Sequence, residues 1–290
     1  PDSSADWWQE WEQIQVDRNW IYYWMGWVDE MAALVERIRP VVERHGAPQQ
    51  RAQFFQSLLS MHLRRERYLL SDQTVEYARR SLEASQETGD TSQVVWAYFC
   101  LAFALLFHGD LDESEQRGLE GLALAEQLGD LTTQSRLLTY LTVLYRARGQ
   151  VAETRRFAER SLEVALAARM EDYVGTARAN LAWVAWKEQR SSEAEQGARA
   201  ALALWRKLSY PYPLQGLALW ILLALELSRG ALEQALEHAR AILDPIQQRL
   251  PEPLETALQE ALRDWSQGLR QQPREHLQRA LGLATRRGLL

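Results

Sequence analysis

Four glycines recur at intervals of twenty residues, Gly89, Gly109, Gly129 and Gly149, in the motifs ETGD, FHGD, QLGD and ARGQ. Glycine followed by Asp or Gln is typical of one helix that ends and another that is capped immediately afterwards. The segments between are rich in Ala, Leu, Glu, Gln and Arg, with apolar residues every three or four positions. The spacing therefore predicts successive helices of about seventeen residues.

The same rhythm continues on both sides of these glycines. The stretch KEQRSSEAEQGARAAL (187–202) repeats RARGQVAETRRFAERSL (146–162) forty residues later, with Gln189 where Gly149 stood. LSRGALEQALEHARAIL (227–243) follows with a shift of one residue. Two helices make a unit of about forty residues, and seven helix pairs are predicted at about 6–46, 47–89, 90–129, 130–170, 171–209, 210–250 and 251–288.

Self-similarity at this period is typical of a solenoid, because one helix pair cannot bury its apolar face without its neighbours. We therefore expect an all-α solenoid that forms a single domain over residues 1–290, since no Gly-, Ser- or Pro-rich linker interrupts residues 29–290. The ankyrin turn signature is missing. HEAT-like arrays share the period, so the choice depends on where the small residues lie.

The small and aromatic residues resemble the tetratricopeptide repeat (TPR). Its first helix carries an aromatic residue, then Leu and a small residue, then another aromatic, and the matching positions are Tyr98, Leu101, Ala102 and Leu105 in one unit and Leu138, Leu141, Thr142 and Tyr145 in the next. Its second helix has small residues where helices cross, matched by Thr154, Ala158 and Ser161 and by Ala194, Ala198 and Ala201. The period of forty exceeds the usual thirty-four, and the repeat-ending proline is mostly absent. The resemblance implies a right-handed superhelix whose first helices line a concave groove.

Longer, degenerate repeats of this kind are similar to the C-terminal sensor array of bacterial STAND proteins, the signal-transduction ATPases with numerous domains. The similar stretches include 35–55, 138–151 and 177–186. This resemblance implies a cytoplasmic protein with a nucleotide-binding module upstream. No P-loop occurs in the sequence, so that module would lie outside it. The opening PDSSAD has neither Met nor a basic signal-peptide start, and we expect an excised piece of a longer soluble protein.

Charge and cysteine content exclude several classes of function. The net charge is -6 and the basic residues are dispersed, which argues against a nucleic-acid partner. The single Cys100 permits neither an intramolecular disulfide nor a cysteine zinc cluster, and its apolar setting predicts a buried residue. The longest apolar stretch, 94–107, is shorter than the roughly 18 to 20 residues of a membrane helix, so no membrane partner is expected.

The sequence offers no constellation for catalysis. The five histidines are scattered without paired zinc-ligand spacing, and no nucleophile elbow is present. Asp110 and Asp112 stand at a predicted helix start, where capping and the helix dipole explain them. We therefore predict a non-enzyme with no cofactor and no metal.

The helix face opposite Leu101 and Leu105 is predicted to line the groove, because steps of three and four keep one side of a helix. The predicted groove residues are Trp20, Tyr23, Trp24, Trp96, Phe99, Phe103, Phe107, Arg136, Tyr140, Arg146, Asn180, Trp183, Trp186 and Trp220. Two interpretations stay open. The rings are core or interdomain packing, each burial stabilising by roughly 1.5 to 3 kcal/mol, or they form a groove with the Trp, Tyr and Arg content of a binding hot spot.

The aromatic stretch NWIYYWMGW (19–27) divides between these faces. Tyr22 aligns with the packing aromatic and Gly26 with the turn before the second helix, while Trp20, Tyr23 and Trp24 point toward the groove. Trp7, Trp8 and Trp11 precede this stretch on the first helix of the array, whose outer side has no neighbouring repeat. We expect them to form an interdomain docking edge.

The predicted function is recognition of a protein or peptide inducer in the groove, which regulates the upstream nucleotide-binding domain of the same chain. The alternative is a TPR scaffold for assembly or self-association without switching.

Overall fold

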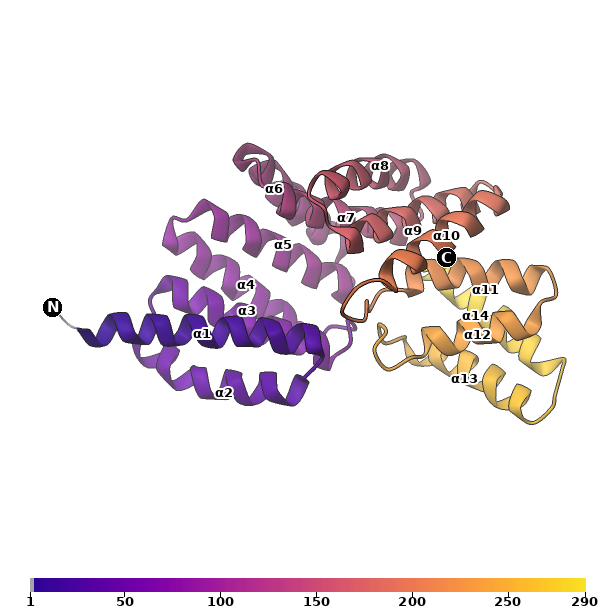
Figure 1. The fold of residues 1–290 in the computed structure, drawn as a ribbon, viewed down its shortest axis with the longest axis horizontal. Coiled ribbons are helices and arrows are strands. Elements are labelled where there is room, and N and C mark those ends of the chain that lie inside the picture. Colours follow the sequence, from indigo (N-terminus) through magenta and orange to yellow (C-terminus); the bar gives the residue numbers. More distant parts are fainter. Residues whose placement is uncertain (1–2) are drawn as a thin grey trace. The chain divides into compact units, whose positions relative to one another are not determined.

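The computed structural model describes residues 3–290, except for the side chains of residues 3–6 and of Gln9. All regular secondary structure in this range is α-helical (Figure 1). Contacts divide the chain into two compact units, an N-terminal unit up to Gly129 and a C-terminal unit from Asp130. The all-α solenoid is confirmed, whereas a single domain over the whole chain stays a prediction.

The N-terminal unit holds three antiparallel helix pairs, and the helices of each pair pack on each other. Its helices are α1 (Ser3–Met25), α2 (Val28–His45), α3 (Pro48–Arg65), α4 (Asp72–Thr88), α5 (Thr91–His108) and α6 (Leu111–Leu128). The first helix α1 also packs on α3, and α4 packs on α5.

The C-terminal unit holds four pairs. Its helices are α7 (Leu131–Ala147), α8 (Val151–Ala167), α9 (Glu171–Lys187), α10 (Ser191–Trp205), α11 (Gly216–Ser228), α12 (Leu232–Ile242), α13 (Glu252–Ser266) and α14 (Gln272–Arg286). The first helices form a row in which α9 contacts both α7 and α11. The last helix, α14, packs on α11 as well as on α13, so the chain returns toward this row.

The glycine punctuation acts as the spacing predicts. Gly89, Gly109 and Gly129 each end a helix with positive φ, at 71°, 112° and 68°, a conformation that disfavours side chains. Gln189 has the same conformation, with φ of 62°, where its repeat partner Gly149 has 72°. The period therefore persists even where the glycine is lost.

The expected side-chain capping is correct at Asp90 and Asp130 and wrong at Asp110 and Gln150. The carboxylate of Asp90 accepts hydrogen bonds from the amides of Ser92 and Gln93. Asp110 precedes α6 but makes no side-chain cap hydrogen bond. Its carboxylate instead lies 2.8 Å from Nδ1 of His108, within hydrogen-bonding distance, and this contact replaces the cap that the sequence predicted.

The small residues that the TPR resemblance places at helix crossings are buried in the second helices. Ala158, Ser161, Ala194, Ala198 and Ala201 are all completely buried. A larger side chain there would hold the two helices apart, because interiors are close-packed.

The most apolar helix is α5, which packs between α4 and α6. At 18 residues it is long and apolar enough to cross a membrane, so the length argument from the sequence was wrong. More than half of it is buried within the protein, and its apolar character is accounted for by that packing. Cys100, on this helix, is buried as expected.

Candidate ligand-binding grooves

The predicted groove residues of the N-terminal unit meet in a continuous row of aromatic rings. Trp20 on α1 lies 6.0 Å from Trp96 on α5, between ring centroids. Along α5 the row continues from Trp96 to Phe99 at 5.1 Å, to Phe103 at 5.8 Å and to Phe107 at 4.8 Å. Spacing of three and four residues places these rings on one side of the helix, as expected.

The row is partly buried. Phe99 and Phe103 are buried, whereas the other three rings are half-buried, namely Trp20, Trp96 and Phe107. The rings cover one another edge to face and obliquely, an arrangement that stabilises beyond burial alone. The middle of the row thus has the character of core, and its ends stay accessible.

Tyr23 and Trp24 extend the row along α1, with their ring centroids 5.2 Å apart. Tyr23 is buried, whereas Trp24 is 38% exposed. The guanidinium of Arg64 lies 4.2 Å over the Tyr23 ring, and its Nε donates a hydrogen bond to the Tyr23 carbonyl oxygen at 2.9 Å. A cation at this position stabilises the ring face that the sequence placed toward the groove.

Tyr68 belongs to the same row but was missed by sequence reasoning. Its hydroxyl is 2.9 Å from that of Tyr23, and its ring lies 6.1 Å from Phe103. It follows α3 in a tight turn with φ of 59°, outside any helix. Because the turn contains no glycine and no periodic apolar residue, nothing in the sequence indicates where this ring points.

In the C-terminal unit, three predicted residues from neighbouring first helices converge. Arg146 on α7 donates from Nη1 to Oδ1 of Asn180 on α9 at 3.3 Å. Its guanidinium lies 5.6 Å from the ring centroid of Trp183, one turn further along α9. All three side chains are buried. Lys187, one turn beyond Trp183 on α9, brings its Nζ to 5.2 Å from the same ring.

This cluster is cationic. Burial lowers the pKa of Arg146 to about 9, which still leaves it charged at neutral pH. Burial, followed by the charge of Arg146, lowers the pKa of Lys187. Within residues 3–290, no Asp or Glu side chain pairs with Arg146, and its Nε and the Nε1 of Trp183 find no hydrogen-bond partner. Such an arrangement is unfavourable unless an acceptor is supplied.

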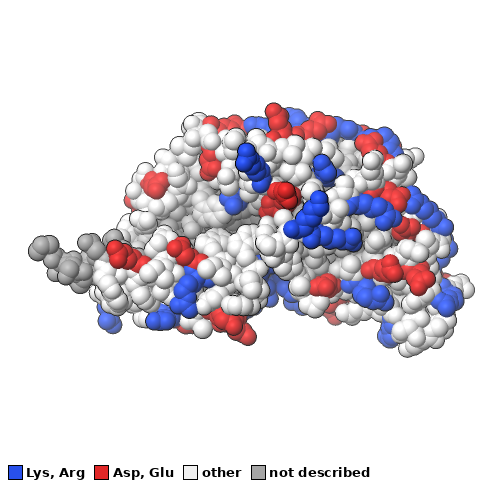
Figure 2. All heavy atoms as spheres, viewed as in Figure 1, with Lys and Arg blue, Asp and Glu red and all other residues white. Residues whose placement is uncertain are grey.

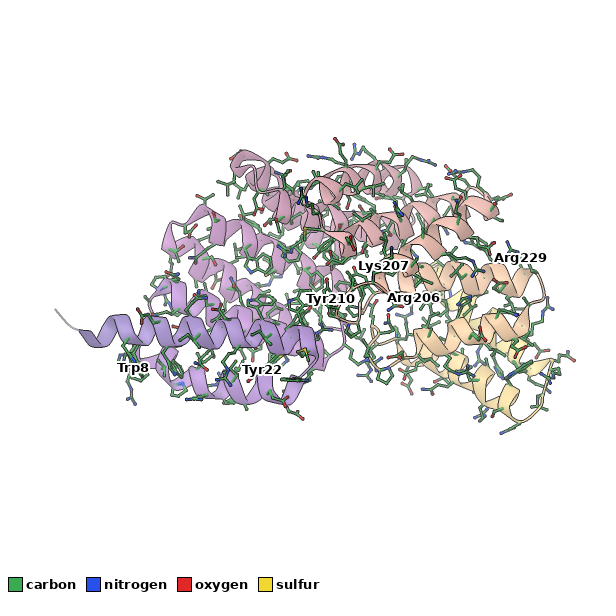
Figure 3. All side chains as sticks on the ribbon, in the orientation of Figure 1. Trp8, Tyr22, Arg206, Lys207, Tyr210 and Arg229 are labelled. Atoms are coloured by element: carbon green, nitrogen blue, oxygen red, sulfur yellow. The ribbon has the colours of Figure 1, made fainter. Side chains whose placement is uncertain are left out.

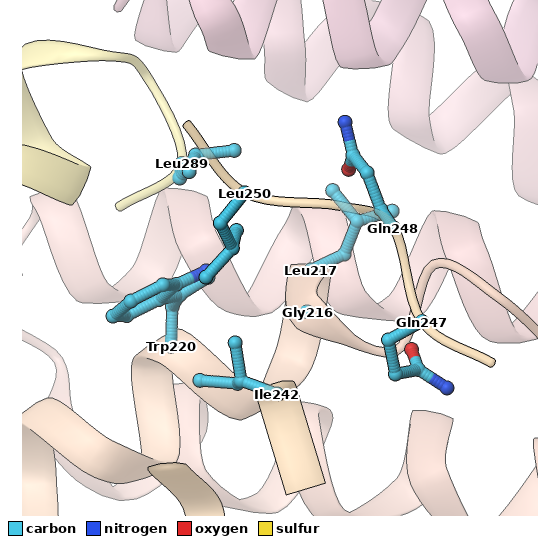
Figure 4. A pocket seen from close by; sticks show the side chains of 8 residues that line it. All are labelled: Gly216, Leu217, Trp220, Ile242, Gln247, Gln248, Leu250 and Leu289. Carbon is cyan, nitrogen blue, oxygen red and sulfur yellow. The ribbon is translucent and has the colours of Figure 1, made fainter. Parts of the chain in front are cut away.

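The last residues of the sequence supply acceptors to this cluster. Arg146 donates from Nη2 to the carbonyl oxygen of Leu289 at 2.6 Å, and Lys187 Nζ lies 3.4 Å from the main-chain oxygen of Leu290. The Leu289 side chain also lines a cavity of about 30 Å³ beside Trp220 (Figure 4). The cavity is lined by Gly216, Leu217, Trp220, Ile242, Gln247, Gln248, Leu250 and Leu289.

Three other predicted groove residues, Arg136, Tyr140 and Trp186, have contacts away from the Arg146 cluster or none that the described residues show with it. Tyr140 packs edge to face on Tyr173 at 6.2 Å, beside the buried core of Ala165 and Val174. Burial raises the pKa of the Asp172 carboxyl group. The positive charge of Arg136, one turn earlier on α7, opposes this shift more weakly. Trp186 is half-buried.

Asp172 belongs to a polar network that the sequence did not indicate. The Tyr210 hydroxyl donates to its Oδ2 at 3.0 Å, and Trp205 Nε1 donates to its carbonyl oxygen at 2.9 Å. The segment that carries Tyr210 and Tyr212 joins α10 to α11, and Tyr212 stacks on Trp205 with centroids 4.7 Å apart. This network anchors a long connection beside the start of α9.

The predicted docking edge on α1 is unevenly exposed. Trp7 is 55% exposed, while Trp8 and Trp11 are half-buried. Trp8 lies on the α2 side of α1, as does Tyr22, and stacks with His45 at 6.3 Å (Figure 3). Trp7, Ile14 and Ile21 are all more than half exposed and are seven residues apart, which places them in one stripe on α1.

Both signs of charge occur on the visible face of the molecule. Acidic and basic side chains are interspersed on the face drawn in Figure 2. The described residues contain no group of three or more His, Cys, Asp or Glu side chains that could hold a metal ion.

No protein-family model and no curated protein matches the sequence. Solved structures do match. The apo form of RapI has a TM-score of 0.65 at 11% identity, covering 95% of this chain and 98% of RapI. The APC/C hetero-tetramer Cut9-Hcn1 has a TM-score of 0.63 at 13% identity, covering 91% of this chain and 45% of that one. A STAND protein with a tetratricopeptide repeat sensor from Pyrococcus horikoshii has a TM-score of 0.57 at 16% identity, covering 86% of this chain and 38% of that one. The chain therefore has a TPR-like helical-repeat fold.

Proposed function

We propose that this chain is a non-catalytic TPR-like domain that senses a protein or peptide inducer on the inner faces of its first helices. The observation that carries the proposal is the contact of Leu289 and Leu290 with Arg146 and Lys187. Their main-chain oxygens accept hydrogen bonds from the two cationic side chains. This face of the C-terminal unit has the donors that an extended peptide needs, and it presents them beside buried tryptophans.

We further propose that inducer binding regulates an upstream STAND nucleotide-binding module in a bacterial, cytoplasmic protein. The support is the likeness to a STAND protein whose sensor is a tetratricopeptide repeat. The exposed Trp7, with Trp8 and Trp11, would dock that module. Such a switch requires the inducer to bind the active arrangement more tightly than the resting one.

A displayed-peptide selection tests the recognition function. Purified full chain is panned against a random peptide library, and enriched peptides are titrated by isothermal calorimetry against the parent protein and two variants. Trp96→Ala and Arg146→Gln probe the two inner faces, and Leu166→Ala, an exposed position on α8, is the control. A loss of at least about tenfold in either inner-face variant supports the proposal. Peptides that bind all variants equally would refute it.

The scaffold alternative is favoured by one observation, the exposed stripe Trp7, Ile14 and Ile21 on α1. Apolar stripes of this kind associate with a partner helix or with a second copy. Light scattering over a hundredfold range of concentration distinguishes the two functions, because a monomer at every concentration counts against self-association.

A further inference from the structure

The apolar stripe on α1 occupies positions that are buried in later first helices. The equivalent positions follow from the hydrogen bonds that close each helix. The amide of Trp27 donates to the carbonyl oxygen of Tyr22, as Asp110 does to Leu105 after α5 and Arg190 to Ala185 after α9. Counting back one and eight residues from these carbonyls gives Ile21 and Ile14 on α1, Ala104 and Ala97 on α5, and Val184 and Ala177 on α9.

Burial at these positions differs sharply between the helices. On α5 and α9 all four residues are at most 1% exposed, whereas Ile14 and Ile21 are 56% and 58% exposed. Trp7, on the turn of α1 that precedes the equivalent start of α5, extends the same line and is also exposed. A contiguous line of exposed apolar side chains is typical of an interaction surface.

The C-terminal unit shows which element covers this face of a first helix. Ala177 and Val184 share one side of α9 with Tyr173, because the steps between them are four and seven residues. Tyr173 belongs to a buried cluster with Ala165 of α8, and Leu162 of α8 packs against that cluster. The face that is open on α1 is therefore covered on α9 by the second helix of the preceding pair.

The covering helix also supplies positive charge to the helix that follows it. Arg155 on α8 pairs with Glu188, the residue that ends α9. Arg199 on α10 pairs with Glu226 on α11 at 2.9 Å. In both cases an arginine of the preceding second helix meets a carboxylate of the next first helix.

On α1, carboxylates flank the exposed stripe. Glu10 and Asp17 are exposed, and each lies three residues after a member of the stripe. Arg18, the one arginine of α1, donates from Nη2 to the Tyr22 hydroxyl at 2.7 Å. A second copy packed through the same stripe would bring carboxylates together, whereas a basic helix would pair with them.

We propose that Trp7, Ile14 and Ile21, with Glu10 and Asp17, form a docking surface for a basic amphipathic helix of a partner protein. The apolar side of this helix would cover the stripe, as α8 covers α9, and its Arg or Lys side chains would pair with the two carboxylates. The inference goes beyond the proposed recognition of an inducer, because none of these residues belongs to the inner faces.

The test uses two peptides that differ in charge alone. Both are fluorescein-labelled and have the sequence of α8, residues 151–167, since this helix covers a first helix in the same chain. The basic peptide carries Glu153→Lys, Glu159→Lys and Glu163→Lys. The acidic peptide carries Arg155→Glu, Arg156→Glu and Arg160→Glu.

Fluorescence polarisation should show that the chain binds the basic peptide at least about tenfold more tightly than the acidic one. The double variant Ile14→Ser with Ile21→Ser should weaken binding of the basic peptide by at least about tenfold. Leu166→Ser is the matched control, because this leucine on α8 is 57% exposed and should leave the affinity unchanged.

Reversing the charge beside the stripe gives a gain that a misfolded chain would not show. Glu10→Lys with Asp17→Lys should make the chain prefer the acidic peptide over the basic one. Glu30→Lys with Glu43→Lys, two exposed positions on α2, should keep the preference of the parent. Circular dichroism verifies that each variant stays helical.

Three results would overturn the inference. Equal affinity for the two peptides would exclude charge recognition, and unchanged binding after Ile14→Ser with Ile21→Ser would exclude the stripe. A parent chain that is a dimer by light scattering, and that Ile14→Ser makes monomeric, would assign the stripe to a second copy.

The proposed function has separate outcomes. Trp96→Ala and Arg146→Gln should bind the basic peptide as tightly as the parent does, even where they lose library peptides. Failure of the basic peptide to bind would remove the partner helix and leave inducer recognition by the inner faces standing.

Discussion

The two compact units have the same helix-pair architecture, but the inner faces of their first helices differ in chemistry: one is aromatic and the other is cationic. In the N-terminal unit the first helices present rings that cover one another, from Trp20 through Trp96 to Phe107. In the C-terminal unit they present a buried guanidinium and an ammonium that need acceptors. Apolar groups are satisfied by any close neighbour, whereas a buried cation requires a specific partner. The repeat fold therefore determines the direction of each helix face. The side chains on that face determine whether it needs apolar contacts or hydrogen-bond acceptors.

The largest expected effect is on the aromatic row. Phe103→Ala should lower the free energy of unfolding by about 3 to 5 kcal/mol, because it leaves a cavity between Phe99 and Phe107 in a buried position. Urea denaturation monitored by circular dichroism measures the change. The matched control is Trp24→Ala at the exposed end of the row, and similar losses at both positions would contradict a buried centre with accessible ends.

The N-terminal unit should also have its own pH dependence. Glu12 on α1 is buried, and burial raises its pKa to about 7 from 4.5. The folded protein therefore holds this proton after the unfolded chain has released it, so stability is complete below pH 4.5 and declines as pH rises to about 7.

Glu12→Gln should remove this decline and raise the free energy of unfolding at pH 8 by about 1 to 3 kcal/mol. Chemical denaturation at pH 5 and pH 8 gives the comparison, with Glu10→Gln on the exposed side of α1 as the control. A parent and an E12Q variant with parallel pH profiles would contradict the buried proton.

Removing the buried charge of the C-terminal unit should stabilise the protein, unlike Phe103→Ala in the N-terminal unit. Arg146→Met replaces a buried charge that has no carboxylate partner by an apolar side chain, and should raise the free energy of unfolding by about 1 kcal/mol at neutral pH. Thermal denaturation compares it with the parent and with Arg156→Met, an exposed arginine on α8. Destabilisation by more than about 2 kcal/mol would mean that Arg146 serves the fold rather than a ligand.

The smallest expected effect is on two equivalent turns of the C-terminal unit, at Gly149 and Gln189. Gln189→Gly relieves a non-glycine residue with φ of 62° and should stabilise the C-terminal unit by about 0.5 to 1 kcal/mol. The reciprocal Gly149→Gln should destabilise it by a similar amount, because φ there is 72°. Equal stability of all three chains would show that the turn tolerates either residue without strain.

Much of the architecture was readable from the sequence because it depends on local periodicity. Positive φ at Gly89, Gly109 and Gly129 ends helices within one or two residues of the predicted boundaries. The small residues Ala158 and Ala198 lie at crossings because no larger side chain fits. Three residues that the periodicity placed on one face, Arg146, Asn180 and Trp183, do converge. That this face lines a ligand groove stays a prediction.

Contacts outside the periodic helices were not predictable in this way. Tyr68 joins the aromatic row from a turn without glycine. The periodic positions of the first helices do not indicate that Tyr210 lies beside Asp172. Asp110 pairs with His108 instead of capping α6. Each of these partners is chosen by the path of a connecting segment, which follows no period.

The sequence by itself determined the helices, their pairing, their seven-fold repetition and the faces on which aromatic and basic residues lie, because a fixed rise and turn per residue convert spacing into direction. Only the tertiary structure decided which of those faces are covered and by what. The contact of the buried Arg146 with Leu289, from the other end of the C-terminal unit, depends on where α14 returns the chain. That return is a long-range packing outcome, and no local pattern encodes it.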